Sequence, residues 1–108
     1  MSVKKLWTEV RKILEKGRGY RLKSIIEEKS DGIDAIFQKG GKKVYVSLSN
    51  KKLSVQRVRR LLSKMQDHEC EEGLLATTRE ATPQARKEAE ANNIEIIDAK
   101  HPLIYIFD

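Results

Sequence analysis

The chain of 108 residues has few of the features that mark several large classes of protein. Its one cysteine, Cys70, cannot form an internal disulfide, which is typical of a reducing cytoplasm. No run of 18 apolar residues is present, so the sequence offers no membrane-spanning helix. The first ten residues lack the apolar core of a secretory signal. We therefore expect one cytoplasmic domain over residues 1–108, with no membrane partner.

Acidic residues are scarce in the first part of the chain, and basic residues are scarce in the last part. Residues 1–66 hold 18 Lys and Arg against 6 Asp and Glu, whereas residues 67–108 hold 4 against 10. Basic charge of this density attracts polyanions, so it predicts a nucleic-acid partner. The heat-adapted surface of a thermophile is the alternative, because such surfaces are also rich in Lys and Glu. Thermophilic surfaces intersperse the two signs, however, and the separation seen here favours a nucleic acid.

In the first half of the chain, apolar spacing predicts one helix and three strands. The helix runs from Val3 to Leu14, and Gly17 or Gly19 would end it. The strands are predicted at 20–29, 33–38 and 44–49. Because short turns containing glycine separate these strands, they should form an antiparallel meander.

The second half reads as alternating helices and strands. One helix begins at Ser54 and has an apolar stripe made of Val55, Val58, Leu61, Leu62 and Met65. A buried strand at 73–77 precedes a second helix, which Thr82-Pro83 begins and Asn92-Asn93 ends. A strand follows at 94–97, and a short last one is an option at 103–107. This order, α-β-β-β-α-β-α-β, predicts an α/β fold with a mixed central sheet and helices on both faces.

Four stretches together carry a family resemblance. They are Glu9 with the glycine break before Tyr20, the turn Ser30-Asp31-Gly32-Ile33-Asp34, the strand 44–49, and the segment GLLATTREATPQARKEAEANNIEIID. In this order they resemble the restriction-endonuclease-like PD-(D/E)xK superfamily. The most similar groups are the Mrr-type restriction endonucleases and the archaeal Holliday junction resolvases. The resemblance spans nearly the whole chain and implies the restriction-endonuclease-like fold.

The resemblance also implies a catalytic set. In active members, the strand corresponding to 44–49 carries Glu or Gln, any residue, then Lys; with a preceding aspartate, these groups hold Mg²⁺ and orient the attacking water. The matching positions are Glu9, Asp34, Ser47 and Ser49, with Asp34 and Glu9 as the metal ligands of an active enzyme. Serine is a weak, neutral ligand for Mg²⁺ and cannot supply the charge of the lysine. We interpret the set as the degenerate remnant of an active site, with no cofactor.

An active enzyme is the first alternative. Lys51 or Lys52, just beyond the strand, would then replace the missing lysine by reaching back roughly 6–7 Å at the usual strand rise. The protein would be an endonuclease similar to the Holliday junction resolvases and dependent on Mg²⁺.

Nucleic-acid binding rests on the helix that begins at Ser54. Arg57, Arg60 and Lys64 lie at i, i+3 and i+7, on the face expected to be opposite the apolar stripe. The predicted nucleic-acid-binding residues are Lys51, Lys52, Arg57, Arg59, Arg60 and Lys64. The resembled nucleases hold the duplex backbone near this strand and helix, so DNA is the expected polymer and binding should depend strongly on salt. A solvated helix face is the bland interpretation of the same charges.

A structural role is the last alternative. A degenerate nuclease domain can serve as a protein-docking subunit of a nucleic-acid-processing complex, and an exposed apolar patch around 103–107 would favour this. The resembled resolvases act as dimers, so a homodimer is a further expectation from the resemblance.

Overall fold

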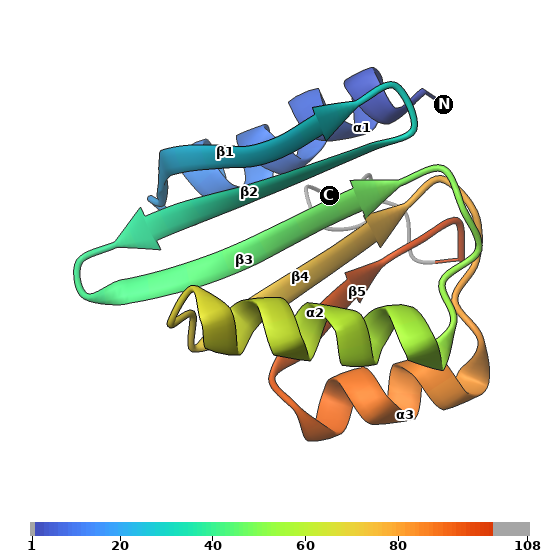
Figure 1. Cartoon of the computed structure of the whole chain (residues 1–108). Helices are drawn as coiled ribbons and strands as arrows, with labels where there is room; N and C mark the ends of the chain where they lie inside the picture. Colours follow the sequence, from blue (N-terminus) through green and yellow to red (C-terminus); the bar gives the residue numbers. More distant parts are fainter. Residues whose placement is uncertain (1, 101–108) are drawn as a thin grey trace.

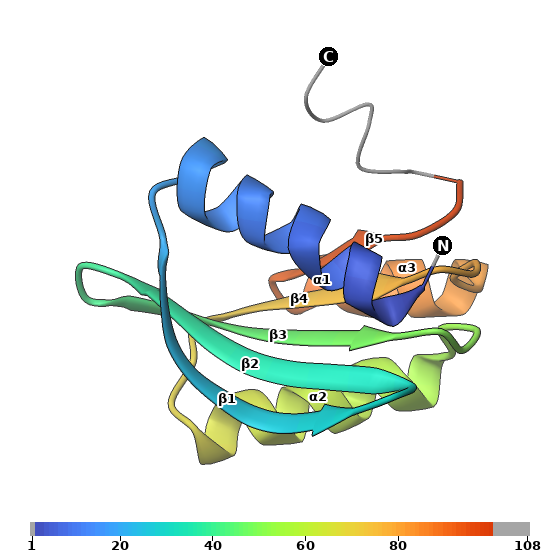
Figure 2. The ribbon, with the colours of Figure 1, turned by 90° about the horizontal axis from the view of Figure 1, so that it is seen from above.

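A five-stranded sheet forms the middle layer of the protein, with helices on both of its faces (Figures 1 and 2). The computed structural model describes residues 2–100. The elements in chain order are α1 (Val3–Arg11), the π-helix η1 (Lys12–Gly17), β1 (Arg21–Lys29), β2 (Gly32–Lys39), β3 (Lys42–Ser49), α2 (Val55–Asp67), β4 (Glu72–Thr77), α3 (Pro83–Ala91) and β5 (Ile94–Ile97). The helix α1 covers one face, whereas α2 and α3 cover the other (Figures 1 and 2).

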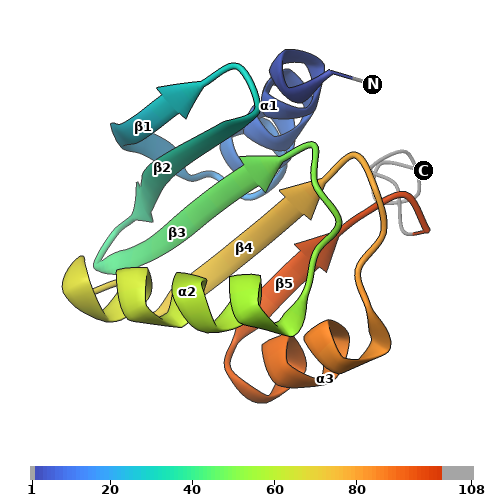
Figure 3. The same cartoon turned by 45° about the vertical axis from the view of Figure 1, so that its right-hand side comes forward.

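The strands lie side by side in the order β1-β2-β3-β4-β5 (Figure 3). The first three strands pair antiparallel, and β4 and β5 run parallel to β3. This confirms the predicted meander, the mixed sheet and the α/β class. The optional strand at 103–107 lies outside the described residues.

The first helical segment ends through its two glycines. Helical structure stops at Gly17, and Gly19 then takes a φ of +75°. The left-handed conformation of Gly19 costs little without a Cβ, and it turns the chain toward β1. The backbone N–H of Tyr20 donates to the carbonyl of Leu14 at 2.7 Å and closes this turn.

Strand alternation produces two separate apolar clusters. On the α1 side, β3 contributes Val44, Val46 and Leu48 to a buried cluster. On the α2 side the same strand presents Tyr45, followed by Ser47 and Ser49. One face of β3 is therefore apolar along its length, and the other changes from apolar to polar as the strand proceeds.

Close packing at one glycine sets the position of α2. A Cβ at Gly73 of β4 would lie 2.7 Å from Sδ of Met65 and 2.9 Å from Cδ2 of Leu61. The predicted stripe is thus the inner face of α2, with Val58, Leu61 and Met65 buried. Ser54 occupies the N-cap position, although its side chain makes no capping hydrogen bond.

The start and packing of α3 follow the prediction. The hydroxyl of Thr82 accepts a hydrogen bond from the backbone N–H of Ala85 at 3.1 Å, and Pro83 lies at the first turn. Ala85 and Ala89 are fully buried against the second cluster. Within residues 2–100, no helix is long and apolar enough to cross a membrane.

Candidate functional site

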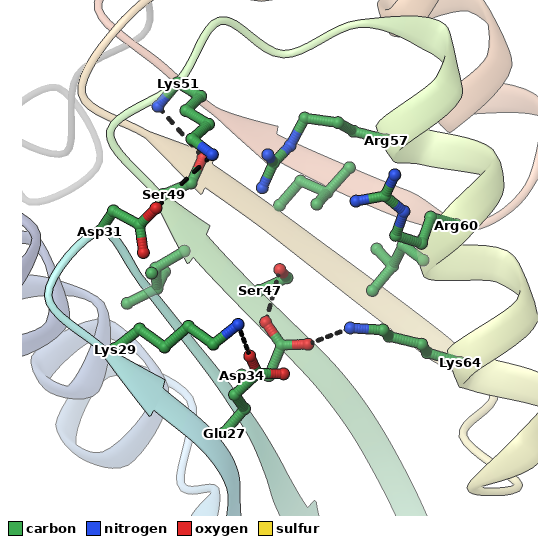
Figure 4. Close-up of a pocket in the computed structure, with 14 residues that line it drawn as sticks. Glu27, Lys29, Asp31, Asp34, Ser47, Ser49, Lys51, Arg57, Arg60 and Lys64 are labelled. Atoms are coloured by element: carbon green, nitrogen blue, oxygen red, sulfur yellow. Dashed lines mark hydrogen bonds and ion pairs between the residues drawn. The ribbon is translucent and has the colours of Figure 1, made fainter.

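A polar pocket of about 140 Å³ lies between α2 and the polar parts of β2 and β3 (Figure 4). Its charged lining residues are Glu27, Lys29, Asp31, Asp34, Lys51, Arg57, Arg60 and Lys64, and Ser47 and Ser49 also line it. The pocket therefore gathers five cations and three carboxylates between β1, the β1–β2 turn, β2, the end of β3 and α2.

Asp34 lies at the centre of a hydrogen-bond network. The register pairs Asp34 of β2 with Ser47 of β3, whose hydroxyl donates to Oδ1 at 2.8 Å. The hydroxyl of Tyr45 and the ammonium group of Lys64 both donate to Oδ2, each at 2.8 Å. Both carboxylate oxygens of Asp34 are thus engaged by the protein itself.

The network controls the ionisation of Asp34 and Tyr45. Burial alone would raise the pKa of Asp34, but the hydrogen bonds from Lys64, Ser47 and Tyr45 outweigh it and hold the pKa below its ordinary value. Burial, followed by the hydrogen bond to Asp34, raises the pKa of the Tyr45 hydroxyl. At neutral pH the pair is therefore a carboxylate accepting from a protonated phenol.

The other two carboxylates in the pocket also have lysine partners. Glu27 pairs with Lys29 at 2.6 Å, and Asp31 pairs with Lys51 at 3.5 Å. With Lys64 on Asp34, three lysines are matched to three carboxylates. The two arginines are the cations that remain.

Arg57 and Arg60 point into the pocket from α2 (Figure 4). In the described part of the chain neither guanidinium has an ion-pair partner, and the buried Nε of Arg57 has no hydrogen-bond acceptor. Burial first, and the neighbouring charge of Arg60 second, lower the pKa of Arg57, while Asp34 and Asp31 oppose this. The two arginines therefore provide an unmatched positive charge inside a hollow.

Most of the predicted site residues meet in this pocket, but not in the expected way. Arg57, Arg60 and Lys64 do not lie opposite the apolar stripe of α2. They lie along the border of this stripe, and their long side chains extend into the pocket, as amphipathic side chains often do. Arg59 instead faces α3 and contacts Glu88 at 3.7 Å. Lys52 is exposed and does not line the pocket.

The predicted partnership of Glu9 with Asp34 needs correction. Glu9 belongs to α1, on the opposite face of the sheet from α2, and it contacts Lys12 at 3.7 Å. Asp34 projects toward α2, because Ile33 and Ala35 on either side of it enter the α1-side cluster. The sheet thus separates the two carboxylates, and they do not form one site.

The pocket residues do not fit a magnesium centre. Mg²⁺ needs several oxygen ligands in octahedral geometry, usually including one or two carboxylates with free lone pairs. Here each carboxylate lies against a lysine, and the two remaining cations, Arg57 and Arg60, would repel a divalent ion. Residues 2–100 contain no cluster of three or more His, Cys, Asp or Glu side chains suited to a metal.

Sequence reasoning missed Tyr45, Glu27 and Lys29. Tyr45 has a signal in the sequence, because it lies two residues before Ser47 and so shares its face of the strand. Glu27 and Lys29 lie on β1, where two irregularities in the pairing with β2 break simple alternation. Their positions in the pocket have no comparable signal in the sequence.

The chain matches the Mrr_cat restriction endonuclease family over residues 1–102. Comparison with curated proteins gave no match. Among solved structures it is similar to AF1548, a protein of unknown function, with a TM-score of 0.65 and 15% identity over 86% of this chain and 56% of that one. It is also similar to EndoMS in apo form, with a TM-score of 0.64 and 17% identity over 89% and 45%.

A third similar structure is the DNA modification-dependent restriction endonuclease AspBHI, with a TM-score of 0.52 and 18% identity over 90% of this chain and 28% of that one. At these identities the likeness shows a shared fold, and it confirms the restriction-endonuclease-like architecture expected from the sequence. The chain spans about half or less of the length of these three proteins.

Proposed function

This chain belongs to the Mrr-type restriction endonuclease family, and from that premise we propose that it binds DNA without cutting it. Binding would use the pocket cations Lys51, Arg57, Arg60 and Lys64, together with Lys52 and Arg59 outside the pocket. The contacts would go to phosphates, so affinity would depend steeply on salt and weakly on sequence.

The observation that carries this proposal is the network around Asp34. In a metal-dependent nuclease the matching aspartate needs lone pairs for the metal. Both oxygens of Asp34 instead accept hydrogen bonds from Tyr45, Ser47 and Lys64. A neutral serine, Ser47 or Ser49, stands at each of the two positions on β3 that the resemblance assigns to catalysis. These features support a degenerate site with no cofactor.

One observation favours the enzymatic alternative. A lysine does meet Asp34, although it is Lys64 of α2 and neither Lys51 nor Lys52. Lys51 is paired with Asp31, and Lys52 lies outside the pocket. If cleavage occurs, Lys64 is therefore the first residue to test as the replacement of the missing lysine. The docking-subunit hypothesis stays a prediction, since residues 103–107 lie outside the described part of the chain. The homodimer expected from the resemblance also stays a prediction.

A combined binding and cleavage experiment tests the proposal. Labelled duplex, branched and single-stranded DNA are titrated with the protein at several salt concentrations, and the same samples are incubated with Mg²⁺ or Mn²⁺ and run on a gel. We expect binding that weakens linearly in log affinity against log salt, with intact DNA in every lane. Cutting that requires metal and disappears in Lys64→Ala would establish the enzymatic alternative.

A pair of matched variants locates the binding surface. Arg60→Gln removes one charge from the pocket, and Lys87→Gln removes one from the exposed surface of α3. The pocket variant should lower the salt slope by about one, because one phosphate contact is lost. Equal effects of the two variants would mean that net charge alone drives binding, and no binding even at low salt would leave the docking role.

A further inference from the structure

The charges in the pocket do not balance within the protein. Each carboxylate there lies against one lysine, so three pairs cancel. Arg57 and Arg60 are left, and both of their positive charges line the same pocket. A bound anion would balance them.

The donors around this charge are also incomplete. Nε of Arg57 is buried without an acceptor among residues 2–100, which is costly for a charged donor. Ser49 is a buried residue that lines the pocket, and its hydroxyl accepts a hydrogen bond from the backbone N–H of Lys51 at 3.4 Å and donates none within the described structure. Its proton is available to a ligand. The pocket therefore offers hydrogen-bond donors without acceptors to match them.

The charge and the shape of the pocket both indicate the class of ligand. A phosphate within a nucleic-acid strand carries one negative charge, whereas a phosphate monoester carries about −1.5 to −2 at pH 7. The monoester thus matches two guanidinium groups better. An internal phosphate also has a nucleoside on each side, which suits an open groove. A terminal phosphate has a nucleoside on one side only, so it can be taken into a pocket of about 140 Å³ with its other side against the protein.

We propose that Arg57 and Arg60, with the hydroxyl of Ser49, form a binding site, the phosphate seat, for a terminal phosphate at a nucleic-acid end. This inference rests on the proposed DNA-binding function and narrows it to DNA ends. Arginine is suited to this task because its planar donors bind phosphate oxygens in pairs. Asp34 stays outside the seat, since its oxygens are occupied by its own partners and Lys64 screens its charge.

The test compares DNA duplexes that differ only at their ends. One internally labelled duplex is prepared with 5′-phosphate, 3′-phosphate or hydroxyl ends, and each form is titrated by fluorescence anisotropy at fixed salt. We expect about tenfold tighter binding for a phosphorylated end, the size typical of a well-made charged hydrogen bond. The two phosphorylated forms show which strand end is preferred.

An exposed lysine on α3 supplies the matched control. Arg57→Gln should abolish the preference for a phosphorylated end, whereas Lys87→Gln removes one charge outside the pocket and should keep that preference. Circular dichroism checks that both variants are folded, and Arg60→Gln is a second pocket variant. Equal wild-type affinity for all three ends, with DNA still bound, would overturn the phosphate seat and leave the proposed function intact. No binding of any duplex would overturn both.

Discussion

The two faces of β2 and β3 are both largely buried, yet they are held together by different interactions. On the α1 face, Ala35, Phe37 and Val46 are fully buried and make only apolar contacts in the first cluster. On the α2 face, Asp34 accepts hydrogen bonds from Ser47 and from Lys64. Apolar burial on the first face gives stability, whereas the polar face holds charges at a defined position. Substitutions should therefore separate stability from binding.

The largest effect is expected on the apolar face. Phe37 has no exposed surface, and its ring lies 5.8 Å from that of Trp7. Phe37→Ala should lower the free energy of unfolding by about 3–5 kcal/mol, because it removes apolar contacts and leaves a cavity. Urea unfolding measures this change. The affinity of the folded protein for DNA should stay unchanged. A large loss of affinity, measured at a low temperature where the variant is folded, would contradict the assignment of stability to one face and binding to the other.

Removal of the cation beside Asp34 should have the next largest effect. Lys64→Met leaves the buried carboxylate without its ion pair. Because the Lys64 side chain is 36% exposed, solvent screens part of the interaction, and we expect a loss of about 1–3 kcal/mol in unfolding free energy. The double variant with Asp34→Asn should be more stable than Lys64→Met alone. If the double variant instead loses the sum of the two single-variant losses in unfolding free energy, Lys64 and Asp34 are not coupled.

A substitution at Gly73, where α2 packs against β4, should lower both the stability and the DNA affinity. Gly73→Ala would bring a methyl group against the ends of the Met65 and Leu61 side chains, so these two inner side chains of α2 must move. We expect a loss of about 1–2 kcal/mol in unfolding free energy, typical of mild overpacking. Because α2 carries Arg57 and Arg60, DNA affinity should also fall. Ala76→Gly, a small change at a buried position on the other face of β4, is the control that should leave affinity unchanged.

The smallest effect is a dependence on pH. The folded pKa of Asp34 lies below the ordinary value of 3.8, so its ionised form stabilises the fold above that value. This contribution is lost as the pH falls below about 4 and through the folded pKa. The stability difference between wild type and Asp34→Asn should therefore shrink in this acid range. Urea unfolding at a series of pH values would show a constant difference if the pKa of Asp34 were not lowered.

The fold could be predicted because its signals are local. Alternation in 44–49, the turn at 30–32 and the Thr82-Pro83 start each follow from a few neighbouring residues. These signals gave the order of elements and the two-sided sheet. The candidate pocket was predictable in part, since Asp34, Ser47 and Ser49 share one face of adjacent strands.

The remaining contacts of the pocket depend on how whole elements pack. A helix seen alone places Lys64 away from its apolar stripe, yet in the folded chain α2 packs on the sheet so that this side chain reaches Asp34. The face of the sheet that α1 covers likewise decides the position of Glu9, and spacing along the chain carries no information about it. The sequence therefore indicated the residue types of the site better than it indicated their partners.

The central claim is that this pocket is a seat for an anion and not for a metal. Nuclear magnetic resonance of ¹⁵N-labelled protein tests it directly, with Mn²⁺ and inorganic phosphate added in separate titrations. We expect phosphate to shift the amide signals of Ser49 and Arg57, and Mn²⁺ to cause no broadening centred on Asp34. Broadening centred on Asp34 at low Mn²⁺, with no response to phosphate, would contradict the claim.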